Sequence, residues 1–150
     1  MKEYKSQIKE FYLSKRQVEF PKVKINNSSD AQKYARLFYA DDIEIYESCF
    51  IILLNNQKDT IGYAKISQGG ITGSVVDVRI VCKYAIESLA TSAIFVHNHP
   101  SGNAGPSSED MKVTEQLRDA LKLLDVRLVD SIILTTDKYF SFADEGYVCR

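Results

Sequence analysis

The chain of 150 residues lacks the features that would place it at a membrane or on nucleic acid. It has no apolar run as long as a membrane-spanning helix, and residues 1–5 contain no apolar core of a signal peptide. It also has no excess charge, because 19 basic and 20 acidic residues nearly cancel. A near-neutral protein has no overall field to draw it onto nucleic acid or anionic lipid.

Cysteine is scarce as well, with three in the chain. Cys49 and Cys82 lie in apolar segments, where a free thiol behaves as a small hydrophobic group, and Cys149 is near the end. Their spacing shows no pairing, which is typical of a protein from a reducing compartment. We therefore expect a cytoplasmic protein without a disulfide framework. A cysteine nucleophile is disfavoured, because it would need a nearby imidazole and both imidazoles have a better use.

Hydrophobic residues make up 45% of the chain, enough to form the core of one domain over residues 1–150. Alternating apolar and charged residues before residue 28, as in residues 18–20 and 23–25, predict edge strands. Caps near Asn27 and apolar residues at helical spacing then predict a helix from about Asp30 to Ala40. Later segments are predicted as strands at residues 49–54, 60–67, 93–96, 126–134 and 139–142, and as helices at residues 78–89 and from residue 107.

Glycines interrupt the stretch between the second of these strands and the next helix. Gly69, Gly70 and Gly73 allow unusual backbone angles or a close approach beside a site, and an ordinary loop explains them equally well. The order of elements as a whole indicates a mixed α/β fold.

Both histidines of the chain lie in the segment His97-Asn98-His99-Pro100. They follow an apolar run, residues 93–96, and so stand at the end of a predicted buried strand. Two imidazoles one residue apart can bind one metal ion, and a carboxylate from the next helix can complete a three-ligand site with one position open. Water at an open position loses its proton near neutral pH, which is what hydrolysis requires.

The carboxylate comes from Ser107-Ser108-Glu109-Asp110. Serine followed three residues later by an acid is also a helix capping box, which alone would explain the pair. The two interpretations are compatible, because a helix that begins at Ser107 points its first turn back toward the histidines. We expect Asp110 to be the third ligand, with Glu109 as the alternative. A His-Asn-His nuclease fits less well, because those enzymes spread their histidines over a strand-strand-helix unit.

The pattern of His-x-His, seven residues and Ser-x-x-Asp, with Pro100 after the second histidine, resembles the signature of the JAMM metallohydrolases, which have the JAB/MPN fold. The longer string from His97 to Gly102, followed by Pro106-Ser107, is similar to the bacterial RadC-like branch, and the likeness extends over residues 44 to 145. The resemblance implies a curved mixed sheet flanked by helices in a single JAB/MPN-like domain. It also implies zinc, one ion per chain, bound by His97, His99 and Asp110.

The resemblance further implies catalytic roles. An upstream glutamate takes the proton from water in this family, and matching the chain without gaps to the histidine motif places that position at Glu47, with Glu44 as the alternative. Ser107 matches the serine that donates a hydrogen bond to the substrate oxygen. The implied activity is that of a metallopeptidase, the hydrolysis of a peptide, isopeptide or other amide bond.

The chain departs from the longer RadC-like proteins at its beginning. Those proteins carry an N-terminal helix-hairpin-helix segment that binds DNA, whereas residues 1–43 form an extension too short for it and lack its glycine-rich hairpin. A DNA-repair role therefore rests on analogy alone, and we expect DNA binding only weakly or through partners. A non-catalytic JAMM-like binding module is the other alternative, although such proteins typically lose the metal ligands. The sequence predicts no oligomeric state.

Overall fold

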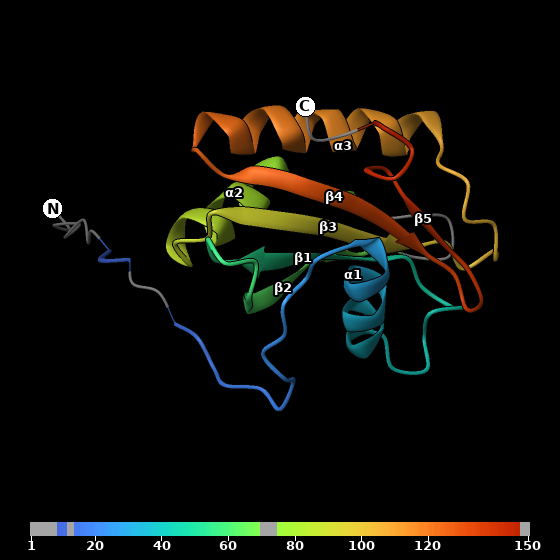
Figure 1. Cartoon of the computed structure of the whole chain (residues 1–150), viewed down its shortest axis with the longest axis horizontal. Helices are drawn as coiled ribbons and strands as arrows, with labels where there is room; N and C mark the ends of the chain where they lie inside the picture. The colour runs from blue at the N-terminus through green and yellow to red at the C-terminus, as the bar shows by residue number, and fades with distance from the viewer. Residues whose placement is uncertain (1–8, 12–13, 70–74, 148–150) are drawn as a thin grey trace, which may run out of the picture.

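The computed structural model describes residues 9–11, 14–69 and 75–147. They form a five-stranded mixed sheet with helices on both faces (Figure 1). The strand order is β2-β1-β3-β4-β5. The strands are β1 (Ser48–Leu54), β2 (Thr60–Gln68), β3 (Ser92–Asn98), β4 (Arg127–Leu134) and β5 (Tyr139–Ser141). The helices are α1 (Ser28–Ala35), α2 (Val78–Glu87) and α3 (Ser108–Leu123), and a short 3-10 helix, η1 (Arg36–Phe38), follows α1. The mixed α/β fold expected from the sequence is confirmed.

The central strands form because their residues are apolar on both faces. In β1, alternate side chains point to opposite faces of the sheet. Cys49, Ile51 and Leu53 join the core beneath α2 and α3, whereas Phe50, Ile52 and Leu54 join the core beneath α1. The unbroken apolar runs of β1 and β3 are therefore the signature of strands covered on both sides.

The chain connections bring the ends of two elements together. β1 is antiparallel to both β2 and β3, whereas β3 and β4 are parallel. A parallel pair needs a crossover, and α3 supplies it by running back along the sheet between the end of β3 and the start of β4 (Figure 1). The first turn of α3 consequently lies near the end of β3, where the histidines are.

Two expectations for the N-terminal part are wrong. Residues 14–23 form no strand, and residues 23–25 contribute only an isolated bridge between Lys24 and Asp59. The apolar residues of this segment pack from an irregular backbone instead, as when Phe20 contacts the rings of Phe38 and Tyr63. The predicted strand pattern in residues 1–8 and 12–13 lies outside the described residues, as do Gly70 and Gly73.

The first helix begins earlier and ends sooner than expected. Asn27 caps it, because its side chain accepts a hydrogen bond from the backbone N–H of Asp30. After η1, Tyr39 adopts an extended conformation and lies buried. Its hydroxyl donates to the carbonyl of Ser48 at 2.7 Å, so a tertiary contact takes the place of the last helical turn. None of the helices in the described part of the chain is both long and apolar enough to span a membrane.

Candidate metal centre

The end of β3 presents both imidazoles on one side of the sheet. His97 and His99 are two residues apart, so strand alternation directs them the same way. Their Nε2 atoms lie 3.2 Å apart. His97 is 4% exposed, and its ring is held by packing, with its centroid 5.6 Å from that of Phe95. The backbone N–H of His99 donates to the carbonyl of Leu134 on β4, which extends the sheet one residue past the strand.

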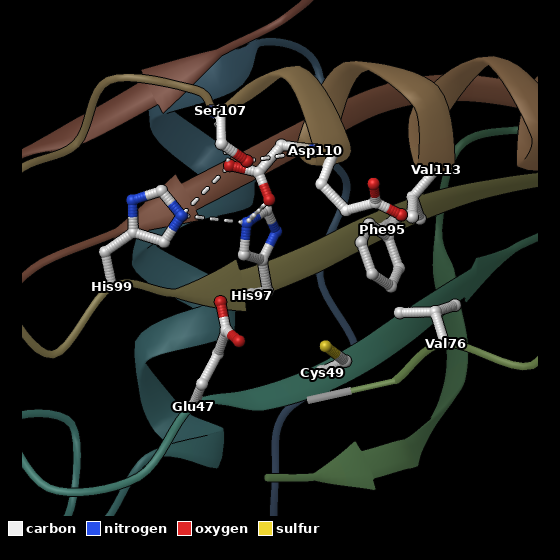
Figure 2. A pocket seen from close by; sticks show the side chains of 10 residues that line it. Glu47, Cys49, Val76, Phe95, His97, His99, Ser107, Asp110 and Val113 are labelled. Carbon is white, nitrogen blue, oxygen red and sulfur yellow. Dashed lines mark hydrogen bonds and ion pairs between the residues drawn. The ribbon is translucent and has the colours of Figure 1, made fainter. Parts of the chain in front are cut away.

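Asp110 reaches the same point from the first turn of α3 (Figure 2). Its Oδ1 lies 3.1 Å from Nε2 of His97, and its Oδ2 lies 3.1 Å from Nε2 of His99. The Oδ2 atom also accepts the backbone N–H of Ser107 at 2.8 Å, while Ser107 Oγ accepts the backbone N–H of Asp110 at 3.0 Å. The capping box is thus formed, and it fixes the rotamer that aims the carboxylate at the histidines.

The three separations fit a metal ion. Zinc bound tetrahedrally at about 2.0 to 2.1 Å places its nitrogen and oxygen ligands about 3.3 Å apart. The Nε2 atoms of His97 and His99 lie 3.2 Å apart, and each lies 3.1 Å from a different carboxylate oxygen of Asp110. The donor set of two imidazoles and a carboxylate is also one that binds divalent transition metals.

The hydrogen bond at Nδ1 of His99 is compatible with metal binding through its other ring nitrogen, Nε2. Its Nδ1 lies 2.8 Å from the carbonyl oxygen of Asn103, which can only accept. Nδ1 therefore carries the proton, and in the neutral ring Nε2 offers a lone pair to the centre. That lone pair faces the oxygens of Asp110, an arrangement that needs a proton or a metal cation between them.

The contact between His99 and Asp110 shifts the pKa values of both side chains. The hydrogen bond that His99 donates to the Asp110 carboxylate raises the pKa of His99 above its ordinary value, although burial opposes this. Burial raises the pKa of Asp110, but the hydrogen bonds with His97 and His99 outweigh it and hold that pKa far below its usual range. The carboxylate is therefore ionised, as a metal ligand must be.

Glu47 faces the same histidines from the opposite side of the cleft (Figure 2). β1 pairs with β3 so that Cys49 is opposite His97, and Glu47 comes two residues before Cys49, at the entry to β1. A carboxylate oxygen of Glu47 lies within 4.8 Å of ring nitrogens of both histidines. Two acids therefore flank the pair. The oxygens of Asp110 lie at 3.1 Å from the imidazole nitrogens, and Glu47 lies within 4.8 Å of them, so Asp110 and Glu47 are both within reach of an ion held by the histidines.

The two alternative acids, Glu44 and Glu109, have different surroundings. Glu44 lies in a separate hollow beside Pro100, where its carboxylate accepts a hydrogen bond from the hydroxyl of Thr136 at 2.8 Å. Glu109 lines the same cleft as Asp110 but is exposed. The structure thus gathers Glu47, His97, His99, Ser107 and Asp110 at one place, and Glu44 is not among them.

The cleft at this centre measures about 240 Å³ and has a polar and an apolar side. The apolar side consists of Cys49, Val76, Phe95 and Val113 (Figure 2). Sequence reasoning missed these residues as part of the site. Val113 is three residues after Asp110 and so shares its helix face, a signal that spacing contains. Val76 comes from a distant segment, and no local pattern indicates it.

Comparison with known proteins identifies the family of the chain. A family model described as a RadC-like JAB domain matches residues 25–147. A protein of Flavobacterium johnsoniae is 45% identical over 101 residues, which are 67% of this chain and 44% of the relative. A protein of Methanosarcina mazei is 39% identical over 132 residues, which are 87% of this chain and 56% of the relative. Both are named "UPF0758 protein".

A third relative with that name, from Vibrio cholerae, is 42% identical over 98 residues, which are 65% of this chain and 62% of the relative. The matched part of the chain thus spans about half the length of these curated relatives. The family model covers the sheet, α1, α2, α3 and every residue of the candidate centre. The chain therefore belongs to the RadC-like JAB domain family.

Proposed function

We propose that this chain is a zinc-dependent hydrolase that cleaves an amide bond, either a peptide or an isopeptide bond. The observation that carries the proposal is the close approach of two imidazoles and a carboxylate: the Nε2 atoms of His97 and His99 lie 3.2 Å apart, and each lies 3.1 Å from one oxygen of Asp110. Glu47 faces them across the open side. Three protein ligands with one side left open are typical of catalytic rather than structural zinc sites.

The chemistry that zinc supplies at such a site is Lewis acidity, which makes water more acidic and polarises a carbonyl group. We assign to Glu47 the role of the base, which accepts a proton from water while the oxygen of that water bonds to the amide carbon. Glu47 then returns that proton to the amide nitrogen, which leaves as the amine when the C–N bond breaks. One carboxylate thus serves as base and then as acid.

Ser107 has a hydroxyl proton to spare for the substrate. Its Oγ accepts the backbone N–H of Asp110, and a hydroxyl that accepts one hydrogen bond still donates another. We assign that donation to the carbonyl oxygen of the substrate, where negative charge develops during the attack. The backbone of Ser107 meanwhile orients Asp110, so the residue serves the substrate and the ligand at once.

The apolar side of the cleft indicates which amides to test first. Val76 and Val113 are partly buried and line the cleft beside the ligands. A substrate with an apolar side chain next to the cleaved bond would cover them and gain the free energy of burying that side chain. Charged or glycine-rich substrates would gain nothing there.

The test is a screen with the zinc-loaded protein. Peptides and lysine isopeptides with apolar or polar residues beside the bond are incubated with it, together with single- and double-stranded DNA. We expect an amide to be cleaved, with the new amine detected, and cleavage to stop in His97→Ala and in protein stripped of metal. A protein that holds one zinc per chain and leaves all the amides intact, or that cuts DNA instead, would refute the proposal.

A further inference from the structure

Asn98, between the two histidines, makes contacts that the metal site does not explain. Strand alternation directs the side chain of Asn98 to the face of the sheet opposite His97 and His99. Its side chain is fully buried. Its Oδ1 accepts the backbone N–H of Ser48 at 2.8 Å, and its Nδ2 donates to the carbonyls of Ile43 at 2.7 Å and Tyr46 at 2.8 Å.

Two of these three hydrogen bonds go to the residues on either side of Glu47. Tyr46 and Ser48 are its two neighbours, and both are bonded to the same amide group. Glu47 lies just before β1, in a segment that turns rather than pairs within the sheet. The carbonyl of Glu47 accepts a hydrogen bond from the N–H of Gly69 at 2.8 Å. The Asn98 amide therefore ties the backbone on both sides of Glu47 to β3.

The chemistry of the group suits the task. The segment offers one donor and two acceptors, and a carboxamide is the side-chain group that answers with one acceptor and two N–H donors. Aspartate at this position would have no donor for the carbonyls of Ile43 and Tyr46. Glutamine would be one methylene longer, in a place that is fully buried.

We propose that Asn98 is a positioning residue that holds Glu47 at its distance from His97 and His99. The same tripeptide then supplies two metal ligands on one side of β3 and, on the other, the anchor for the base that faces them. This inference rests on the proposed function for the catalytic meaning of Glu47, but the placement of Glu47 is measurable by itself. A base displaced by about 1 Å can cost about 10²-fold in rate.

The experiment compares Asn98→Ala and Asn98→Asp with two further variants. Tyr39→Phe removes one bond to the same segment, that to the carbonyl of Ser48. Ser131→Ala is the matched control, because Ser131 is equally buried and bonds to Thr114 rather than to residues 43–48. The first measurement is the nuclear Overhauser effect between the side-chain protons of Glu47 and the ring protons of His97 and His99. The second is the zinc content with kcat and KM on an amide that the wild-type protein cleaves.

We expect the wild-type protein and Ser131→Ala to show the Overhauser contacts, and the Asn98 variants to lose or weaken them while keeping zinc. Their kcat should fall roughly 10- to 100-fold with KM little changed, and Tyr39→Phe should change in the same direction by less. If neither Asn98 variant folds, Tyr39→Phe decides. Unchanged contacts and kcat in the folded variants, or an equal loss in Ser131→Ala, would overturn the proposal. If the wild-type protein cleaves no amide, the proposed function fails, while the Overhauser comparison still decides the role of Asn98.

Discussion

At the scale of the residue, the site uses two acids in different ways. Asp110 is hydrogen-bonded to both imidazoles and to the backbone of Ser107. Glu47 faces the imidazoles within 4.8 Å from the segment just before β1. Neutralising each acid without changing its size should therefore have different effects, one on metal binding and the other on the chemical step.

Glu47→Gln should keep its zinc and its fold but hydrolyse slowly. The amide cannot accept the proton of water, and general base catalysis is commonly worth about 10²- to 10⁴-fold in rate. Elemental analysis and steady-state kinetics on the same preparation measure both properties. Glu109→Gln is the matched control, since Glu109 lines the cleft from an exposed position. A Glu47→Gln protein that loses zinc, or works as fast as the wild type, would show that Glu47 is not the base.

Ser107 combines a helix cap with a proposed hydrogen bond to the substrate, and Ser107→Gly separates them. Glycine is nearly as good a cap as serine, so the variant should lose only a few tenths of a kcal/mol in stability, whereas Ser107→Ala should lose about 0.5 to 2 kcal/mol. Both lack the hydroxyl, and loss of such a donor typically lowers kcat about 10²- to 10³-fold. Urea unfolding and kinetics measure the two effects. If kcat falls in Ser107→Ala alone, the serine acts only as a cap.

At the scale of the element, β4 is joined to the turn after β5 by one buried acid. Asp130 accepts hydrogen bonds from the hydroxyl of Ser141 and from the backbone N–H groups of Ser131 and Ala143. Burial raises the pKa of Asp130, and the nearby Asp144 adds to this, although the three hydrogen bonds act in the opposite direction. Folding therefore favours the protonated form of this side chain.

Asp130→Asn should consequently change how stability depends on pH. An acid whose pKa is raised on folding stabilises the fold fully below its unfolded pKa of about 3.9, and this contribution is lost as the pH rises through the folded pKa. From pH 4 upward, the free energy of unfolding of the wild-type protein should thus fall relative to that of Asp130→Asn. Urea unfolding of both zinc-free proteins at several pH values measures the difference. If the difference in free energy of unfolding between the two proteins is constant with pH, or changes in favour of the wild type as the pH rises, the pKa of Asp130 is not raised on folding.

The elements that sequence predicted well are those with one strong periodic signal. β1 and β3 are apolar throughout because both faces are covered, and α3 combines a capping serine with apolar residues at helical spacing. The N-terminal segment misled, because Phe20 and its neighbours pack from an irregular backbone, and apolar alternation alone does not reveal this.

The residues of the candidate site also differ in how well the sequence predicted them. His97, His99 and Asp110 belong to one local pattern, so the sequence indicated them together. The carbonyl of Asn103 and the side chain of Val76 were not predictable. A backbone group leaves no trace in a sequence pattern, and Val76 belongs to the segment before α2, which no local pattern links to the histidines.

At the scale of the whole molecule, the charge balance bears on the DNA alternative. The formal net charge is −1 at pH 7, so few counterions would be released from DNA and binding should be weak and only shallowly dependent on salt. Titration of the chain with labelled duplex and single-stranded DNA at two salt concentrations measures this. A tight complex at physiological salt with a steep salt dependence would favour a direct role on DNA.

We propose that His97, His99 and Asp110 together bind one metal ion, and the metal content of the purified protein tests this most directly. In protein prepared without chelator, we predict about one zinc per chain, and far less in His97→Ala and Asp110→Asn, since each weakens one of three ligands. Removing the metal should lower the melting temperature, because binding to the folded state alone at 100 times Kd is worth about 2.7 kcal/mol. A wild-type protein without bound metal, whose melting temperature a chelator leaves unchanged, would show that these three residues do not form a metal site.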